Sequence, residues 1–515
     1  MHTGGTRGTP VLQEARRRRI ASIEQRITRS YDATTARPGR RHKDTRMDTE
    51  LLSRIQFAVT IGFHFLFPPI SIGLAWLLVV IETIAWKSGS DAYDRAGRFF
   101  GKLLGLTFAM GVATGIVMEF QFGTNWDRYS RVVGDIFGAP LAAEGVFAFF
   151  LESGFLGLYL FGRSRVSKKI HVLSIFMVAI GATLSAFWII VANSWMQTPD
   201  GYTVAAIAPG APPYVPGTPI DPTLYRAELT SFWAAVFNPS TMVRYLHTMA
   251  AAIVCGAFFM AGGAAWILRR DSANAMARGA LKVSVIGGLI FSVLVAFPFG
   301  HEHAQQVART QPEKFAAIEG LYTTRSRAPL VFFAYPQTAP PELRARIEMP
   351  GLLSWMAFGD INAEIKGIDQ FPPDRIPPLW LTFVSFHNMV LLGMFFIAVM
   401  ALGAWLLYRG KLHTSRRVLM LFIIGVPLSL AACQFGWVAA EVGRQPWIVY
   451  GLMLTKDAYS VTVPAGQVLA SLLIFGAVYL LLLVLYLYLL IGKLNHEAQG
   501  AAASAPAADG LASGL

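Results

Sequence analysis

Charged residues and cysteines are both scarce in this sequence. Only 15% of its 515 residues are charged, while 54% are hydrophobic, whereas about a quarter of a soluble globular domain is charged. The two cysteines, Cys255 and Cys433, both lie inside apolar runs. We therefore expect no disulfide framework, no zinc cluster and, without a C-x-x-C-H motif, no covalent c-type haem. Both thiols are interpreted as small buried hydrophobic groups.

The sequence contains several long apolar runs with few charged residues. Nine of them have about 20 residues or more, the length that crosses a bilayer core of ~30 Å. They are residues 54–86, 99–122, 140–162, 171–196, 243–268, 281–299, 379–407, 417–440 and 467–492. A transmembrane β-barrel would instead show short alternating segments. We predict an all-α polytopic membrane protein, with helices 1–6 in residues 47–299, a loop over residues 300–378, and helices 7–9 in residues 379–496.

The Lys and Arg residues of the connections predict the orientation in the membrane. The connections on one side hold 15 of them, whereas the short connections on the other side hold five. The first side is therefore predicted to be cytoplasmic, with the N-terminus and loop 300–378 outside and the C-terminus in the cytoplasm. Glu82 and Lys102 lie near cytoplasmic ends of their spans, and we expect them to extend to the interface.

Both ends of the chain differ in composition from the apolar runs. Residues 1–46 hold 12 Lys and Arg but 4 Asp and Glu. The run Arg16–Arg19 is of a kind that binds nucleic acid, but so much positive charge outside opposes the predicted topology, and we expect no nucleic-acid partner. The segment also lacks the apolar core of a secretory signal. We interpret it as a disordered or non-native extension before Met47, and residues 497–515, rich in Ala, Gly and Ser, as a disordered tail.

Ligand-type side chains gather in the outer half of six spans. They are His64, Glu119, Glu144, His247, Met389 and Glu441. Such groups are costly in hydrocarbon, so a cluster at one depth indicates one extended site. His, Met and oxygen ligands are typical of haem iron, whereas copper or zinc needs several imidazoles close together. The alternatives are a histidine bonded to a neighbouring carbonyl and a methionine that only packs.

A second set of polar groups lies deeper in the predicted bundle. Glu152 follows Glu144 by eight residues, which places it about 12 Å deeper along a helix. We interpret Glu152 as a candidate proton-relay carboxylate, which Ser185 and Asn193 on the next span would extend, although packing contacts explain these two residues equally well.

Five motifs resemble subunit I of cytochrome bd-type quinol oxidases, in order from about Met47 to the end of the ninth span. They are SRIQFAVTIGFHFLFPP, MEFQFGTNWDRYSRVVGDIFGAPLAAEGVFAFFLESGF, LSAFWIIVANSWMQTP, KFAAIE and AEVGRQPW. The resemblance implies an enzyme of the bacterial cytoplasmic (inner) membrane that oxidises quinol at the outer face and reduces dioxygen to water without copper. It implies three haems: a low-spin haem b, a high-spin haem b, and haem d or a third haem b. It also implies a homologous subunit II and a small accessory single-helix subunit.

The resemblance carries haem ligands over to five residues. His247 and Met389 match the axial pair of the low-spin haem b. His64 matches the histidine of the two high-spin haems, and Glu144 and Glu441 match carboxylates at the same irons. Which high-spin haem each of them serves stays open.

The resemblance also implies roles in proton and electron transfer. Glu152 and Ser185 match the proton route from the cytoplasm. Lys314 and Glu319 match a pair implicated in quinol oxidation in loop 300–378. Arg444 matches an arginine near the haems, where its charge would suit haem propionates or reduced iron. The expected mechanism is a redox loop, with protons released outside and taken up from the cytoplasm.

Two features depart from the long-loop members of that family. His387 stands where those members have an arginine, two residues before the ligand methionine. At 100° per residue it points roughly 200° away from Met389, so we expect it to supply polarity rather than bind the same haem. The loop also lacks their long insertion. A short loop of this kind is similar to that of the cyanide-insensitive branch of the family.

Two other classes of function remain as alternatives. A secondary transporter would hold an ion at the membrane midplane, but the ionisable groups cluster toward one face and no internal repeat is visible. A haem-b quinol-dehydrogenase anchor would pass electrons to a partner without touching dioxygen. A spectrum of reduced membranes separates them, because only the oxidase adds a red-shifted chlorin band.

Overall fold

The structure is a computed structural model that describes residues 48–338 and 341–503. The expected extension over residues 1–46 lies outside these ranges. Residues 497–503, predicted to belong to a disordered tail, continue the last helix; residues 504–515 lie outside the described part of the chain.

Within the described ranges, nine helical runs are long and apolar enough to cross a membrane, which confirms the predicted spans. They are α2 (Thr49–His64) with α3 (Pro68–Ser88), α4 (Asp91–Thr124), α5 (Asp127–Ala143) with η1 (Glu144–Phe149) and α6 (Phe150–Phe161), α7 (Lys168–Gln197), α9 (Thr241–Leu268), α10 (Ala275–Leu294) with η2 (Val295–Gly300) and α11 (His301–Thr310), α14 (Leu379–Tyr408), α15 (Arg416–Val442) and α16 (Ala465–Ala503).

Three spans are interrupted, and each interruption lies at or beside a predicted site residue. The first span breaks after His64, where Pro68 and Pro69 begin α3. The third contains the π-helix η1, which starts at Glu144, and the sixth contains η2, which includes Pro298. Proline has no N–H to donate within a helix, and π-helical turns are frequent at functional sites. The breaks therefore place backbone irregularity where ligand-type side chains lie.

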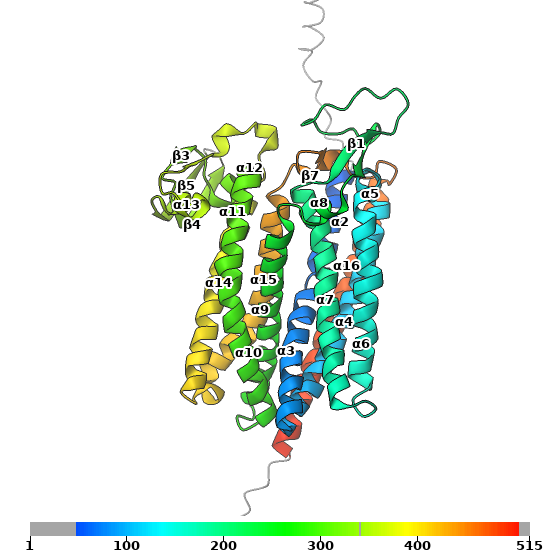
Figure 1. Cartoon of the computed structure of the whole chain (residues 1–515). Helices are drawn as coiled ribbons and strands as arrows, with labels where there is room; N and C mark the ends of the chain where they lie inside the picture. The colour runs from blue at the N-terminus through cyan, green and yellow to red at the C-terminus, as the bar shows by residue number, and fades with distance from the viewer. Residues whose placement is uncertain (1–47, 339–340, 504–515) are drawn as a thin grey trace, which may run out of the picture. The chain divides into compact units, whose positions relative to one another are not determined.

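The longer connections gather at one end of the bundle, as Figure 1 shows for β1, β7, α8 and α12. Their elements are β1 (Tyr202–Ala206), β2 (Tyr225–Leu229), α8 (Phe232–Val236), α12 (Pro312–Glu319), β3 (Arg325–Ser326), β4 (Leu330–Thr338), β5 (Pro341–Met349), α13 (Leu352–Phe358), β6 (Glu364–Ile365), η3 (Ile368–Gln370), η4 (Pro373–Arg375), β7 (Trp447–Val449), β8 (Met453–Leu454) and η6 (Thr455–Asp457). The pairs β1–β2, β3–β6, β4–β5 and β7–β8 are antiparallel. At the other end the connections are short and include η5 (Leu412–Thr414).

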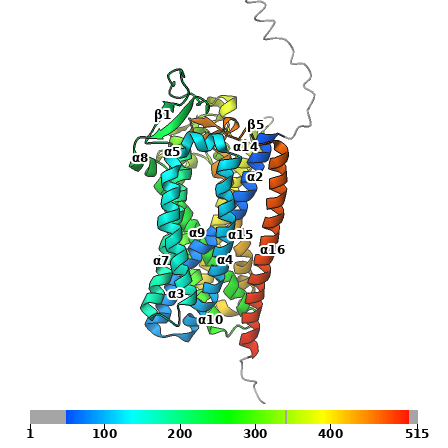
Figure 2. The same ribbon diagram turned by 90° about the vertical axis from the view of Figure 1, so that its right-hand side faces the viewer.

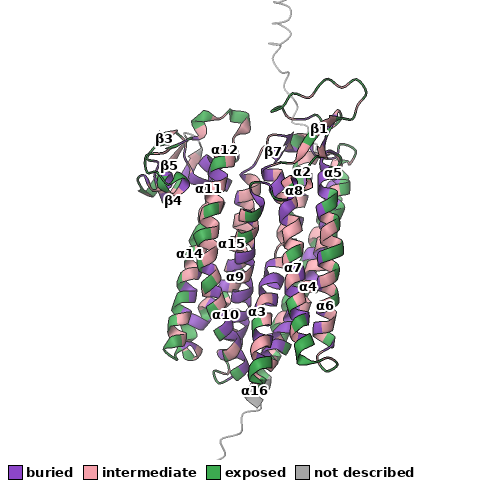
Figure 3. Cartoon of the chain, in the orientation of Figure 1, coloured by how far each residue is buried: buried purple, intermediate pink, exposed green. Residues whose placement is uncertain are grey.

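The helix α9 is the centre of the bundle, and the buried residues in Figure 3 surround it. It packs against α3, α10 and α15, and 89% of its most apolar window is buried, against 11% for α16. Its crossing with α3 is close because glycines meet there. A Cβ on Gly256 would lie 2.3 Å from the carbonyl carbon of Gly73. Small residues at such crossings let helix backbones approach in membranes.

The last span lies at the edge of the bundle, where Figure 2 shows α16 beside α2. It packs against α2, α9 and α4, and apolar side chains such as Leu480 and Leu481 are exposed along it. The two largest differences from the predicted boundaries are that the third span begins at Asp127 and that the sixth continues to Thr310. The first part of the predicted loop 300–378 is therefore helical.

One interfacial expectation is wrong. Glu82 is buried and accepts hydrogen bonds from Arg163 Nη2 at 2.5 Å and from Tyr159 Oη at 2.9 Å. The carboxylate is paired inside the bundle, because Arg163 folds back over the end of α3. Lys102, by contrast, is exposed as expected.

Replacing Gly256 with alanine should separate α3 from α9. The added methyl overlaps the backbone of Gly73, and overpacking of this kind costs about 2 kcal/mol. We expect a lower midpoint of thermal unfolding for the purified protein in detergent. Gly476→Ala is the matched control, because no atom of the described chain lies within 4 Å of that position. Equal midpoints for the two variants would contradict a close crossing.

Candidate functional site

The carboxylate of Glu441, one residue before the end of α15, lies at the centre of a polar cluster. Arg444 Nη2 is 2.5 Å from Glu441 Oε2, and Arg244 Nη2 on α9 is 3.9 Å from Oε1. The amides of Asn193 and Gln197 on α7 donate to Oε1 at 3.1 Å and 3.2 Å. Arg244 also donates to Asn193 Oδ1. Side chains of α7, α9 and α15 thus converge on one carboxylate.

Lys314 connects loop 300–378 to this cluster. Its Nζ donates to Gln197 Oε1 at 3.0 Å and to Gln311 Oε1 at 3.3 Å, and the side chain is buried. Burial lowers the pKa of the Lys314 ammonium well below its usual value, and the charge of Arg244 lowers that pKa further. Because Gln197 also donates to Glu441, one glutamine joins the loop to the bundle.

Positive charge exceeds negative charge in the cluster. Two guanidinium groups, those of Arg244 and Arg444, lie against one carboxylate, and the amine of Lys314, whose pKa is lowered, lies beside them on Gln197. Over the described ranges, Arg244 Nε and both Nε and Nη1 of Arg444 are buried without a hydrogen-bond partner. Unpaired buried donors are costly, and guanidinium groups bind carboxylates well. The cluster therefore favours a further anionic group such as a haem propionate.

Arg244 and Gln197 were not predicted as site residues. Arg244 lies three residues before His247 inside an apolar run, and a buried arginine in a span is itself a signal of function. Gln197 lies in the motif NSWMQTP, but only the folded chain places it between Lys314 and Glu441.

The ring of His247 on α9 is oriented by the backbone of η2. Its Nδ1 lies 3.1 Å from the carbonyl oxygen of Val295. If Nδ1 carries the proton, Nε2 has the free lone pair, the arrangement that metal-binding histidines use. His303 on α11 lies beside it, with the ring centroids 5.5 Å apart. This second imidazole was not predicted.

A glycine lies close to each of two other predicted ligands. A Cβ on Gly436 would be 3.0 Å from Met389 Sδ, and a Cβ on Gly115 would be 3.1 Å from His64 Cε1. His64 Nδ1 lies 3.0 Å from Thr114 Oγ1. At both positions the missing side chain leaves the room that the predicted ligand occupies.

The helix that carries Gly436 and Glu441 is incompletely covered by its neighbours near these residues. Every residue from Ala431 to Val438 is only partly buried, although α15 packs against α9 and α14. His64, His247 and Met389 are also only partly buried. Together with the glycines and the excess of cations, this pattern fits large, flat, anionic groups such as haems held inside the bundle.

The deeper carboxylates lie along the contact between the third and fourth spans. Ser185 Oγ donates to Glu144 Oε1 at 2.7 Å, so the structure brings these two predicted residues together. Glu152 is buried and packs on the backbone of Gly181, where a Cβ would lie 2.9 Å from Glu152 Cβ. Gly181 precedes Ser185 by one helical turn, which places Glu152 one turn deeper on the same face of α7.

The two predicted quinol residues point to different sides of α12. Lys314 and Glu319 are five residues apart, which is about 140° around a helix. Glu319 is 4% exposed, and its Oε2 has no hydrogen-bond partner among the residues described. Burial raises the pKa of Glu319 to about 8. Lys314 thus faces the bundle, while Glu319 is a protonated or nearly protonated carboxyl at neutral pH.

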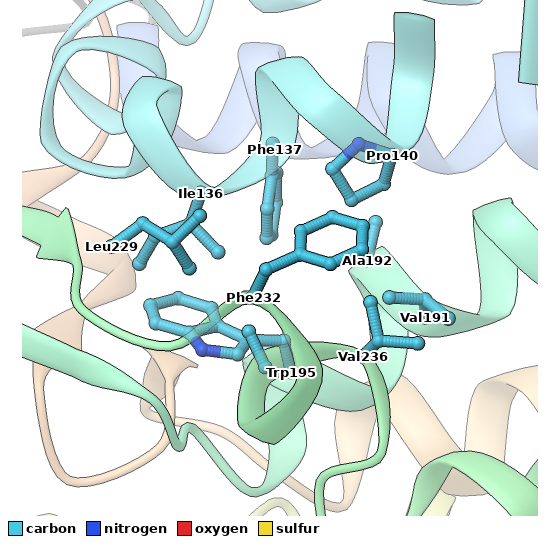
Figure 4. A pocket seen from close by; sticks show the side chains of 10 residues that line it. Ile136, Phe137, Pro140, Val191, Ala192, Trp195, Leu229, Phe232 and Val236 are labelled. Carbon is cyan, nitrogen blue, oxygen red and sulfur yellow. The ribbon is translucent and has the colours of Figure 1, made fainter. Parts of the chain in front are cut away.

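A small apolar cavity lies apart from these residues. Figure 4 shows side chains of α5, α7 and α8 around it, among them Phe137, Trp195 and Phe232. Its volume is about 10 Å³, room for about one water molecule. None of the predicted ligands lines it, so it is not the candidate site.

Comparison with known proteins identifies the family. Residues 52–498 match the family described as cytochrome bd terminal oxidase subunit I. The chain is 38% identical to cytochrome bd ubiquinol oxidase subunit 1 of Bacillus subtilis, over 88% of this chain and 95% of that one. It is 34% identical to cytochrome bd-II ubiquinol oxidase subunit 1 of Escherichia coli, over 85% of this chain and 95% of that one.

A solved structure has the same fold. The bd oxidase from Geobacillus thermodenitrificans is similar with a TM-score of 0.79 and 30% identity, over 87% of this chain and 99% of that one. The polytopic helical bundle and the site described above thus define a subunit of a membrane-bound terminal oxidase. The chain belongs to the cytochrome bd terminal oxidase subunit I family, which confirms the resemblance, and the transporter and anchor alternatives gain no support.

Replacing Arg244 with methionine should lower the haem content of the purified protein by half or more. The change removes a buried cation that pairs with Glu441, and breaking a buried ion pair costs about 3 kcal/mol. It also removes a hydrogen-bond donor for an anionic group. The haem-to-protein ratio, measured as the pyridine haemochrome, checks this. Arg226→Met is the control, because Arg226 is exposed and pairs with Glu228 on the surface. Equal ratios in both variants would exclude Arg244 from the site.

Proposed function

We propose that this chain is the catalytic subunit of a quinol:dioxygen oxidoreductase, in which quinol is oxidised beside loop 300–378 and dioxygen is reduced at haems inside the bundle. The observation that carries the proposal is the hydrogen-bonded connection from Lys314 through Gln197 to Glu441. It joins the predicted quinol-oxidising loop to a predicted haem ligand within one buried network.

Five side chains would hold the haems. His247 and Met389, on α9 and α14, would hold a low-spin haem b, and the Val295 carbonyl orients His247 through Nδ1. His64, Glu144 and Glu441 would hold a high-spin haem b and a third haem, which is haem d or haem b. When bound, haem iron supplies one-electron steps and an open position for dioxygen.

The protein's own groups control charge and protons around these ligands. Arg444 and Arg244 compensate the Glu441 carboxylate and provide donors for propionates. Glu152 would pass protons toward Glu144, and Ser185 already donates to the Glu144 carboxylate. Glu319 would accept a proton from quinol in its ionised form, whose share increases as the pH rises toward its pKa of about 8.

We also propose an orientation of the chain in the membrane and its partner subunits. By the positive-inside rule, the N-terminus and the quinol-oxidising loop face outward and the C-terminus faces the cytoplasm of a bacterial inner membrane. Protons from quinol are released outside, and those that form water come from the cytoplasm through Glu152, so a gradient arises without a proton pump. The relatives are named as subunit 1 of their oxidases, which supports a homologous subunit II; an accessory single-helix subunit is also proposed.

The reduced-minus-oxidised spectrum of the purified oxidase tests the haem assignment. We expect a low-spin haem b band together with a red-shifted chlorin band if the third haem is haem d. Met389→Leu should abolish the low-spin band, because leucine has no thioether to bind iron. Met394→Leu, an exposed residue on the same helix, should leave the spectrum unchanged. A spectrum with no haem bands would overturn the proposal, and one with low-spin haem b alone would favour an anchor.

The pH dependence of quinol oxidation tests Glu319. A carboxyl whose pKa is about 8 is mostly protonated at pH 6, so it cannot accept a proton, and it ionises as the pH rises toward 8. We expect kcat/KM for quinol to rise roughly tenfold per pH unit below that pKa. Glu319→Gln should remove this rise and lower kcat/KM at pH 8 by roughly 100-fold.

The control for this profile is Glu364→Gln, an exposed carboxylate in the same loop. It should keep the profile of the unmodified enzyme. If Glu319→Gln kept the same slope, another group would be the proton acceptor.

A further inference from the structure

The ring of His387 on α14 connects the ligand helix to loop 300–378. Its Nδ1 lies 3.0 Å from the carbonyl oxygen of Phe383, one turn earlier in α14. Its Nε2 lies 3.1 Å from the carbonyl oxygen of Val331, on β4 of the loop. The imidazole also stacks on the ring of Phe383, with centroids 3.8 Å apart and planes 25° apart. Three contacts therefore hold the ring in one orientation.

This orientation leaves His387 no role as an iron ligand. Each ring nitrogen faces a carbonyl oxygen, so neither the N–H nor the lone pair of the imidazole is presented to the bundle interior. With the proton on Nε2, the ring donates to the Val331 carbonyl. The positions of these two carbonyl oxygens support the prediction that His387 does not bind the same haem as Met389. The contact across 56 residues to Val331 makes the ring a tie between two elements rather than an isolated polar group.

Phe383, which stacks on His387, also contacts the residue that caps α12. Phe383 is 2% exposed, and a Cβ on Gly320 would lie 2.8 Å from Phe383 Cε2. Gly320 has φ of +66° and caps α12 directly after Glu319. Only a residue without a side chain fits both this conformation and the contact. The stacked rings therefore touch the loop at two points, β4 and the residue that follows Glu319.

The neighbouring residue of α14 packs into the same loop. Phe386 lies against the hydrophobic cluster that includes Phe315 and Ile318 of α12. Side chains near the start of α14 thus form the surface on which the loop packs. The hydrogen bond of His387 to Val331 fixes where β4 lies on that surface. Met389 is two residues further along the same helix.

We propose that His387 is a positioning residue, which holds β4 on α14 and, through Phe383, fixes Glu319 against the helix that carries Met389. The inference rests on the proposed function, because it assigns His387 a part in placing the quinol-oxidising carboxyl. It concerns the geometry of the loop and involves no bond to iron.

Two variants of the full-length oxidase complex separate the hydrogen bonds from the stack. His387→Phe keeps an aromatic ring against Phe383 but removes the ring N–H that donates to the Val331 carbonyl. His387→Gln keeps an amide that still donates toward β4. The matched control is Asn388→Ala, because Asn388 Nδ2 donates to Val384 O within its own helix. Reduced-minus-oxidised spectra confirm that each variant is folded and loaded.

Hydrogen exchange of residues 330–337 and steady-state quinol kinetics are the two measurements. We expect His387→Phe to speed exchange in β4 by about tenfold, as the loss of one hydrogen bond of ordinary strength does, and to raise KM for quinol about fivefold with a smaller change in kcat. His387→Gln should fall between His387→Phe and the unmodified enzyme, and Asn388→Ala should match the latter.

Unchanged exchange in His387→Phe would overturn the tie. Faster exchange with an unchanged KM would overturn the link from the tie to Glu319. If the unmodified complex oxidised no quinol at all, the proposed function would fail, while the exchange difference between His387→Phe and Asn388→Ala would still support the tie.

Discussion

The pairing of one carboxylate with buried cations is the constraint on which this site depends. Glu441 cannot stay ionised inside an apolar bundle unless its charge is compensated, and Arg444, Arg244 and the amides of α7 compensate it. Each of these groups comes from a different part of the chain. The requirement to satisfy Glu441 therefore fixes how α7, α9 and α15 meet, and Lys314 brings the loop to the same point.

The buried cations around Glu441 carry more charge than this one carboxylate. Other features of the same region also indicate that it binds a further group. Guanidinium nitrogens that have no partner among the described residues occur in the same region as the glycines beside Met389 and His64 and a stretch of α15 that its neighbours cover only in part. A bundle that packed only against itself would bury these surfaces and pair these donors. We interpret them as the protein's half of contacts that anionic, planar groups complete.

Much of the fold and many of the site residues were predictable from the sequence because they depend on local chemistry. Apolar length decides which segments span a membrane, and the nine runs correspond to nine spans in the described ranges. The boundaries were less predictable. The sixth helix continues into polar residues such as His301 and Glu302, since a helix that begins in the membrane can extend beyond the apolar run. Glu82 was misplaced for a similar reason: its partner Arg163 is 81 residues away.

The sequence by itself determined the class of the protein, the number of spans and the residue types that can bind haem, because these follow from composition, run length and short motifs. Only the tertiary structure decided which of those residues work together. It joined Lys314 to Glu441 through Gln197, paired Ser185 with Glu144, separated Lys314 from Glu319 on opposite sides of one short helix, and turned His387 toward Val331. The physical reason is that hydrogen bonds and ion pairs act over a few ångströms between side chains that lie far apart in the chain, so their partners exist only once the helices have packed.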